Sequence, residues 1–241
     1  MGGLGSLQGR GVSARPVFTL RIMRMSSSAE TRPDLDRLFE DLSHPNPNIQ
    51  NQAFWAMVEH YPQESMPRLL ALLDQSDTSL RRAAVRGMGA FGEISLQPLA
   101  EKFRSSEDGT VRASCVKAYV QVAANYPDEP FSKDAMAVLE EALEDDCPVV
   151  SQSAVMALGQ VGKQGAAGKQ ALPLLLKICQ GENIAHMQSA VMALGEIDDP
   201  DSEASLRALL ADESMDPLVK EVAESSLARF ENMKANRPVS G

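Results

Sequence analysis

An internal repeat constrains the fold of this 241-residue chain more than any other feature of its sequence. The eight residues QSAVMALG occur at 152–159 and again at 188–195. Four weaker copies align with them on one small residue, and the six aligned positions are Ala53, Ala84, Cys115, Ala154, Ala190 and Ala223. Their spacing averages about 34 residues, the length of a two-helix solenoid unit. The sequence therefore predicts an all-α, right-handed α-solenoid of about six two-helix repeats over residues 33–233.

Each copy of the repeat has a first helix, a polar turn and a second helix that contains the aligned residue. The first helices are expected near 34–42, 64–73, 96–103, 132–143, 169–179 and 203–210. The turns are rich in Asp, Asn, Ser and Thr, which are the residues that cap helix N-termini. Three glycines are predicted to end second helices, namely Gly89, Gly159 and Gly195.

The second helices show two distinct faces. The positions four before, one after and four after the aligned residue are apolar in most copies, and the position three after it is always small. These positions share one side at 100° per residue and are predicted to form the core. His186 falls in one of these core columns, so a structural histidine is expected there.

The opposite face is expected to line the concave groove of the solenoid. It has a basic middle, and an exposed apolar residue such as Trp55 on a polar face is typical of a binding surface. The predicted groove residues are Asn51, Trp55, Glu59, Arg82, Arg86, Lys117, Gln121, Gln152, Met156, Gln188 and Met192. Cations in the groove of an acidic protein indicate that the groove binds an anionic patch of a partner or a carboxylate ligand.

Composition excludes several classes of function. The net charge of −10 argues against a nucleic-acid partner. No apolar run approaches the roughly 18–20 residues that span a bilayer, so no membrane partner is expected. The three cysteines include no CxxC pair, which excludes a disulfide framework and a Cys₄ zinc site and favours a reducing compartment such as the cytoplasm.

The cysteines do not form a strong metal motif. Cys115 occupies the aligned core position, where an inert buried thiol is expected. Cys147 and Cys179 fall near the turn edge of adjacent repeats, and stacking could bring them together. They are therefore weak candidates for contact with a metal or with an iron–sulfur partner.

The two ends of the chain differ from the repeat region. Residues 1–29 contain four arginines and no acid. The segment 1–32 is interpreted as a disordered basic arm, as a transit peptide that would direct the protein to the plastid stroma, or as a start codon assigned too early, with Met25 as the natural start. Residues 234–241 are expected to form a disordered tail.

The repeat resembles the HEAT-like repeat of the cyanobacterial phycobilin lyase clan, which contains E- and F-type chains. The resemblance spans residues 34–231 and depends on VRASCVKA at 111–118, LRRAAVRGMGAFG at 80–92 and the two QSAVMALG copies. Arg81 and Arg112 match the arginine that the clan has at the start of the second helix. We expect them to form ion pairs with Asp77 and Asp108 in the preceding turns.

The resemblance implies a role in the assembly of pigmented antenna proteins. Lyases of this clan deliver a linear tetrapyrrole of the phycocyanobilin type to a cysteine of a phycobiliprotein, and they usually work as a pair of different chains. Groove cations would then hold the two propionates of the pigment transiently, with no cofactor bound stably. The same repeat also serves partners of iron–sulfur assembly.

Three functional hypotheses follow from these observations. The groove residues contain no recognisable catalytic set, so the preferred hypothesis is a non-catalytic scaffold or chaperone. Its client would be a protein, either a phycobiliprotein subunit or a second HEAT-repeat chain. The alternatives are a bilin lyase subunit, which would form a carbon–sulfur bond, and a partner of an iron–sulfur carrier.

Overall fold

Helices account for all the regular secondary structure of residues 32–165 and 167–236, which are the residues that the computed structural model describes. The first helices of successive repeats are α1 (Leu35–Asp41), α3 (Pro62–Leu72), α5 (Glu93–Ser105), α7 (Lys133–Leu143), α9 (Leu172–Cys179) and α11 (Pro200–Ala211). The second helices are α2 (Pro47–His60), α4 (Thr78–Ala90), α6 (Gly109–Asn125), α8 (Pro148–Gly162), α10 (Ile184–Leu194) and α12 (Pro217–Ala235). A short 3₁₀ helix, η1 (Ala167–Ala171), precedes α9 and takes the first residues of the helix predicted at 169–179. The predicted all-α solenoid is confirmed.

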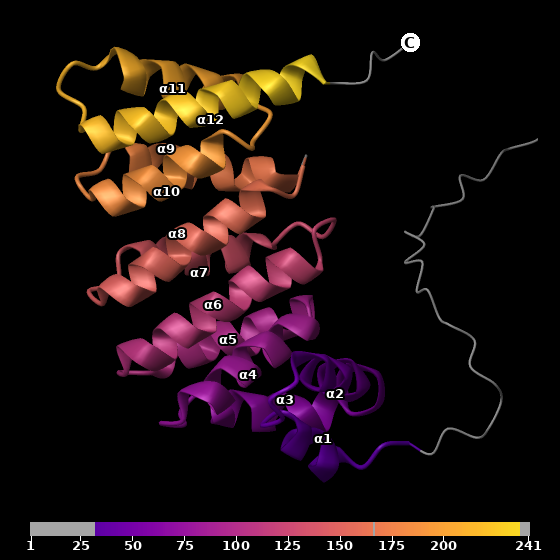
Figure 1. The fold of residues 1–241 in the computed structure, drawn as a ribbon. Helices are drawn as coiled ribbons and strands as arrows, with labels where there is room; N and C mark the ends of the chain where they lie inside the picture. The colour runs from indigo at the N-terminus through magenta and orange to yellow at the C-terminus, as the bar shows by residue number, and fades with distance from the viewer. Residues whose placement is uncertain (1–31, 166, 237–241) are drawn as a thin grey trace, which may run out of the picture. The chain divides into compact units, whose positions relative to one another are not determined.

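The helices stack in two layers in the order of the sequence. Each second helix contacts the next one along the chain, from α2 to α4 and onward to α12. Figure 1 shows α6, α8, α10 and α12 side by side, with the first helices behind them. One layer therefore consists of second helices, and it presents the face that the sequence pattern assigns to the groove.

Side-chain caps fix where most of the second helices begin. In five of the six repeats the residue before the helix is Asn or Asp, and its side chain accepts a backbone N–H of the first turn. These caps are Asn46, Asp77, Asp108, Asn183 and Asp216, with N···O distances between 2.7 and 3.1 Å. Such a cap contributes about 1 kcal/mol to helix stability. Cys147 occupies the sixth position and makes no such bond.

Most positions of the predicted core columns are buried, although Ile49, Leu80 and Val85 are only half-buried. The column four residues after the aligned position contains Met57, Met88, Tyr119, Leu158 and Leu194, each at most 1% exposed. His186, in the column four residues before it, is half-buried, and burial lowers its pKa. The last repeat departs from the pattern, since Ser226 is buried and its hydroxyl has no partner among the described residues.

Of the three glycines predicted to end second helices, only Gly195 does so. Gly89 and Gly159 lie within α4 and α8, whereas Gly195 does cap α10, and none of the three has the positive φ of a glycine C-cap. A Cβ atom at Gly89 would lie 2.2 Å from the Cβ of Gln121 on α6, and one at Gly195 would lie 2.8 Å from the carbonyl oxygen of Ser226. Gly89 and Gly195 therefore allow neighbouring helices to approach closely.

The described residues also bear on the predicted boundaries. A compact unit begins at Pro33. The predicted arm at 1–32 lies outside the described residues except for Arg32, as do residues 237–241 of the predicted tail. The predicted start of that tail at residue 234 is wrong, because α12 continues through Ala235. Within the described ranges, no helix combines the length and the apolar character that a membrane span requires.

Candidate functional site

A hollow of about 950 Å³ opens over the second-helix layer, between α4, α6 and the start of α8. We refer to this hollow as the second-helix groove. Its principal lining residues are Arg81, Arg82, Val85, Arg86, Lys117, Val120, Gln121, Cys147, Val149 and Met156. Its floor therefore combines cationic side chains from α4 and α6 with apolar side chains from α4, α6 and α8.

The groove contains only part of the predicted face. Five of the predicted residues line it, namely Arg82, Arg86, Lys117, Gln121 and Met156. The other six lie on the same layer outside this hollow: Asn51, Trp55 and Glu59 on α2, Gln152 on α8, and Gln188 and Met192 on α10. Trp55 and Met192 are 44% and 50% exposed, so both extend the face as isolated apolar points.

Sequence reasoning missed two apolar residues on this face. Val149 lines the groove and Leu218 lies on α12, and they are 52% and 56% exposed. Val149 stands seven residues before the predicted Met156, and residues seven apart lie on one side of a helix. The same pattern that selected Met156 could therefore have selected Val149.

The cations of the groove are not paired with carboxylates. Arg81 donates to the carbonyl oxygen of Gln75 at 2.6 Å, and Arg86 donates to the amide oxygen of Gln50. The Nε of Arg86 is buried without a partner, and neither Arg82 nor Lys117 makes a hydrogen bond or ion pair with any described residue.

The described lining includes no Asp, Glu or His, and only Arg81 is near enough to a carboxylate, that of Asp108, to help lower its pKa. Arg82, Arg86 and Lys117 therefore carry the unpaired positive charge of the groove.

Several cations of the first-helix layer pair with acids of neighbouring repeats. These pairs are Arg68 with Asp36 at 2.8 Å, Lys102 with Asp74 at 2.5 Å, Arg104 with Glu141 at 2.6 Å and Lys177 with Glu144 at 3.1 Å. Exposed pairs of this kind each contribute little stability, about 0–1 kcal/mol. Lys133 on α7 makes no such pair among the described residues, so it is a matched comparison for Lys117 outside the groove.

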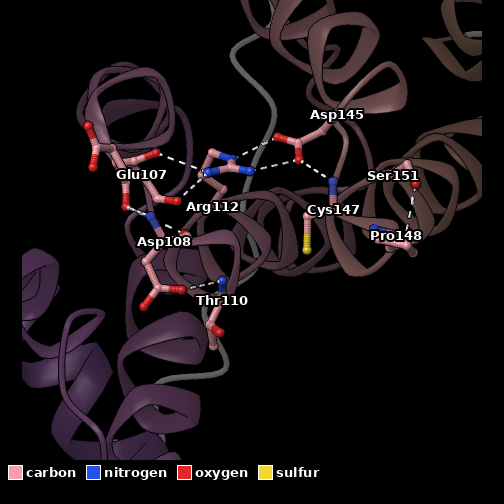
Figure 2. A network of polar contacts seen from close by, with 9 residues as sticks. Glu107, Asp108, Thr110, Arg112, Asp145, Cys147, Pro148 and Ser151 are labelled. Carbon is pink, nitrogen blue, oxygen red and sulfur yellow. Dashed lines mark hydrogen bonds and ion pairs between the residues drawn. The ribbon is translucent and has the colours of Figure 1, made fainter.

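The partner predicted for Arg112 is wrong. Asp108 caps α6 through the backbone N–H of Thr110, whereas Arg112 pairs with Asp145 of the next repeat. Its Nε and Nη2 atoms donate to the two carboxylate oxygens at 2.7 and 2.9 Å (Figure 2). A third nitrogen, Nη1, donates to the carbonyl oxygen of Glu107 at 2.9 Å. The arginine therefore ties one turn of the solenoid to the next, and its hydrogen bonds lower the pKa of Asp145.

Arg81 departs from its prediction in the same way. Asp77 accepts backbone N–H groups at the start of α4 and makes no ion pair with Arg81 among the described contacts. Arg81 instead donates to the turn carbonyl of Gln75 and to the hydroxyl of Thr78 at 3.3 Å. In both repeats the acid caps the helix and the arginine binds a backbone carbonyl of the turn.

Cys147 lies at the edge of the groove, beside the Arg112–Asp145 pair (Figure 2). Its backbone N–H donates to the carboxylate of Asp145 at 2.8 Å. A Cβ added at Gly109 would lie 2.7 Å from the Cys147 sulfur, so the missing side chain at Gly109 provides the space for this sulfur. The thiol is half-buried and lines the groove.

The two weak metal candidates do not share a hollow. Cys179 is 5% exposed, and burial raises its pKa to about 12. It lines a different hollow, with Met187 on α10 and Met215 before α12. The described part of the chain contains no group of three or more His, Cys, Asp and Glu side chains placed to hold a metal ion. The hypothesis of an iron–sulfur partner therefore stays a prediction, and no metal site among the described residues supports it.

Comparison with known proteins identifies the class of protein first. Residues 35–120 and 136–228 match the family model for HEAT repeats, so the chain belongs to the HEAT repeat proteins. The chain is 44% identical over 181 residues to the bilin biosynthesis protein CpeZ of Synechococcus sp. (strain WH8020), with 75% of this chain and 97% of that protein covered. It is 39% identical over 198 residues to the uncharacterized phycocyanin operon protein Z of Pseudanabaena tenuis (strain PCC 7409), with coverages of 82% and 95%.

A solved structure agrees with this assignment at the level of the fold. The complex of CpcE and CpcF of phycocyanin lyase from Nostoc sp. PCC7120 matches with a TM-score of 0.54 and 20% identity, over 67% of this chain and 97% of that chain. The chain is therefore a HEAT-like repeat protein of the bilin lyase clan, as its sequence resemblance predicts.

Proposed function

We propose that this chain is a scaffold or chaperone that serves bilin-carrying proteins and holds a phycobiliprotein subunit in the second-helix groove. The observation that carries the proposal is the set of cations in that groove that no described carboxylate neutralises. Unpaired charge and exposed apolar side chains on one face are the properties of a surface that a partner covers. The relatives named for bilin biosynthesis and for a phycocyanin operon support the choice of client.

The composition of the groove favours binding over catalysis. General acid–base chemistry needs a group that titrates near the working pH, most often His, Asp or Glu. The described lining contains none of these residues. Arginine and lysine side chains instead supply fixed positive charge and hydrogen-bond donors, which suit recognition of carboxylates.

A capture experiment tests the proposal. The tagged protein is mixed with purified pigment-free phycobiliprotein subunits, and affinity is measured for wild type, Lys117→Ala and Lys133→Ala. Both lysines are exposed and unpaired among the described residues, but only Lys117 lines the groove. We expect Lys117→Ala to weaken capture severalfold and Lys133→Ala to leave it unchanged. Failure of wild type to capture any subunit would refute the proposal.

The exposed Trp55 provides a second test of the same surface. Replacing Trp55 with alanine should weaken client capture without unfolding the protein, because this side chain is 44% exposed. If the free energy of unfolding falls by more than about 2 kcal/mol, Trp55 is part of the core and the face has been assigned wrongly.

A second candidate function is that of a bilin lyase subunit. The groove volume of about 950 Å³ lies within the range of small-molecule sites. Its cations could hold two propionates, while Val85, Val120 and Met156 could contact the pyrrole rings of a transiently bound linear tetrapyrrole. Mixing the protein with a linear tetrapyrrole should then shift the visible absorbance of the pigment, and Lys117→Ala should reduce that shift. Pigment-free client capture without any shift would favour the scaffold.

A further inference from the structure

We propose that the client segment seated on the second-helix layer is an amphipathic α-helix with carboxylates toward α4 and α6 and apolar side chains toward α8 and α10. This inference rests on the proposed function, since it names the chemistry that the client presents. It depends on three features of the layer, which are the order of its exposed residues, the spacing of its helices and the sign of its charge.

The side chains of one column follow a fixed order along the layer. The position two residues after the aligned one is Trp55 on α2, Arg86 on α4, Lys117 on α6, Met156 on α8, Met192 on α10 and Ser225 on α12. The methionines are 51% and 50% exposed, whereas Arg86 is half-buried. A partner that crosses α4, α6, α8 and α10 therefore meets two cations and then two apolar side chains.

The spacing of the second helices fits a helical partner. Successive second helices pack directly against one another, and packed helices lie about 8–10 Å apart. A helix rises about 1.5 Å per residue, so side chains seven residues apart on one face are about 10.5 Å apart. Each step of seven residues on the client thus reaches the next second helix. Side chains of an extended segment alternate between opposite faces, so its same-face steps of two or four residues span about 7 or 13 Å and match this spacing less well.

The positive charge of the second-helix layer restricts which partner can bind it. The segment 1–29 of this chain contains four arginines and no acid, so like charges oppose its binding beside Arg82, Arg86 and Lys117. On a second copy of the chain, Glu141 and Glu144 pair with cations of their own chain, whereas the exposed acids Glu40 and Glu64 make no ion pair among the described residues. Self-association through this layer is therefore the competing outcome, and the size of the protein alone in solution would reveal it. A separate chain with unpaired carboxylates is the complementary partner.

Designed peptides test the helical register on the full-length protein. The probe is a fluorescein-labelled helical peptide of roughly 30 residues, with Glu at two positions seven residues apart and Leu at the next two positions in the same register. It is made in both chain directions. The comparison peptides replace the Glu pair with Lys or reduce the spacing of the four residues from seven to two, which places them on one face only in an extended segment. Affinities are measured by fluorescence anisotropy.

We expect the Glu peptide in one direction to bind at least about tenfold more tightly than both comparison peptides. Lys117→Glu should weaken the Glu peptide and strengthen the Lys peptide, whereas the matched Lys133→Glu on the first-helix layer should change neither. Equal affinities of the Glu and Lys peptides, or an equal effect of Lys133→Glu, would overturn the charge assignment. Tighter binding of the peptide with two-residue spacing would overturn the helical occupant.

The peptide and the client report on different claims. If phycobiliprotein subunits are captured through Lys117 but no peptide of the series binds, the proposed function stands and the amphipathic helix is wrong. If the Glu peptide binds in register but no subunit is captured, the layer binds acidic helices and the proposed client is wrong. Thermal unfolding of each variant, followed by circular dichroism, verifies that a loss of affinity does not come from a loss of fold.

Discussion

Replacing Gly89 with alanine tests whether the close contact between α4 and α6 holds the groove together. An added Cβ would lie 2.2 Å from the Cβ of Gln121 and 3.2 Å from its Cα. Ordinary contacts between such atoms begin near 3.4 Å, so one helix must move by about 1 Å or more. These two helices carry Arg86 and Lys117, so the shift should also change the groove.

The expected change in the free energy of unfolding of Gly89→Ala is a balance of two effects. Alanine in place of glycine within a helix stabilises it by about 0.5–1 kcal/mol. Forcing an extra carbon into a packed contact costs about 1–3 kcal/mol, and the contact at Gly89 involves the base of a side chain and the backbone, which cannot rotate away. We therefore expect Gly89→Ala to lower the free energy of unfolding by about 1–2 kcal/mol. The Tm should fall by about 2–4 °C for each kcal/mol.

Gly159 provides a matched control from the same column of the repeat. It also lies within a second helix, but its added Cβ would meet only the Cβ of Ala193, at 3.7 Å. Gly159→Ala should therefore retain the gain in helix propensity, about 0.5–1 kcal/mol, without a clash. Urea unfolding followed by circular dichroism measures both variants, and fluorescence of the single tryptophan, Trp55, reports on α2 separately.

The comparison has a clear refuting result. If Gly89→Ala is as stable as Gly159→Ala, the two helices do not approach closely at Gly89 and the packing account of this glycine is wrong. If Gly89→Ala is destabilised but binds the Glu peptide with unchanged affinity, the contact supports stability alone and does not shape the groove.

Three further predictions concern the turn between α7 and α8. Cys147→Ser should raise the free energy of unfolding by about 0.5–1 kcal/mol, because serine is nearly isosteric with cysteine and caps helices well. A variant that unfolds at lower urea concentration than wild type would contradict this. Asp145→Asn should cost about 2 kcal/mol at neutral pH. Since the Arg112 hydrogen bonds lower the pKa of Asp145, the pair stabilises the fold above the unfolded pKa of about 3.9, and this contribution is lost as the pH falls through the folded value. The variant should thus lose less stability than wild type on acidification, and identical pH profiles would argue against the pair. Burial raises the pKa of Cys115 and Cys179 to about 12, so a thiol-reactive disulfide reagent at pH 8 should modify Cys147 first. If the fast phase of this modification reaction persists in Cys147→Ser, the prediction is wrong.

The order of the helices was predictable from the sequence alone. Helix formation, capping and the burial of one helical face depend on residues within a few turns of one another, so a repeat of about 34 residues displays them directly. The columns that contain Met57, Met88 and Leu158 are buried as the pattern predicts. The Asn and Asp residues of the turns cap the helices that follow them.

The contents of the site depended on contacts between repeats. The pattern could not show that Arg112 pairs with Asp145 rather than Asp108, because the partner lies 33 residues away, on the next turn of the solenoid. It also could not separate the glycines by role, since the space at Gly89 is set by Gln121 on a neighbouring helix.

The sequence thus determined the solenoid and the face that carries the cations. Tertiary structure decided which of the predicted groove residues share one hollow, and it placed Cys147 at the edge of that hollow, where Gly109 leaves room for its sulfur. It also left Arg82 and Lys117 without a described acidic partner. The physical reason is that local periodicity fixes the direction of each side chain, whereas the distance and twist between stacked helices fix which side chains meet.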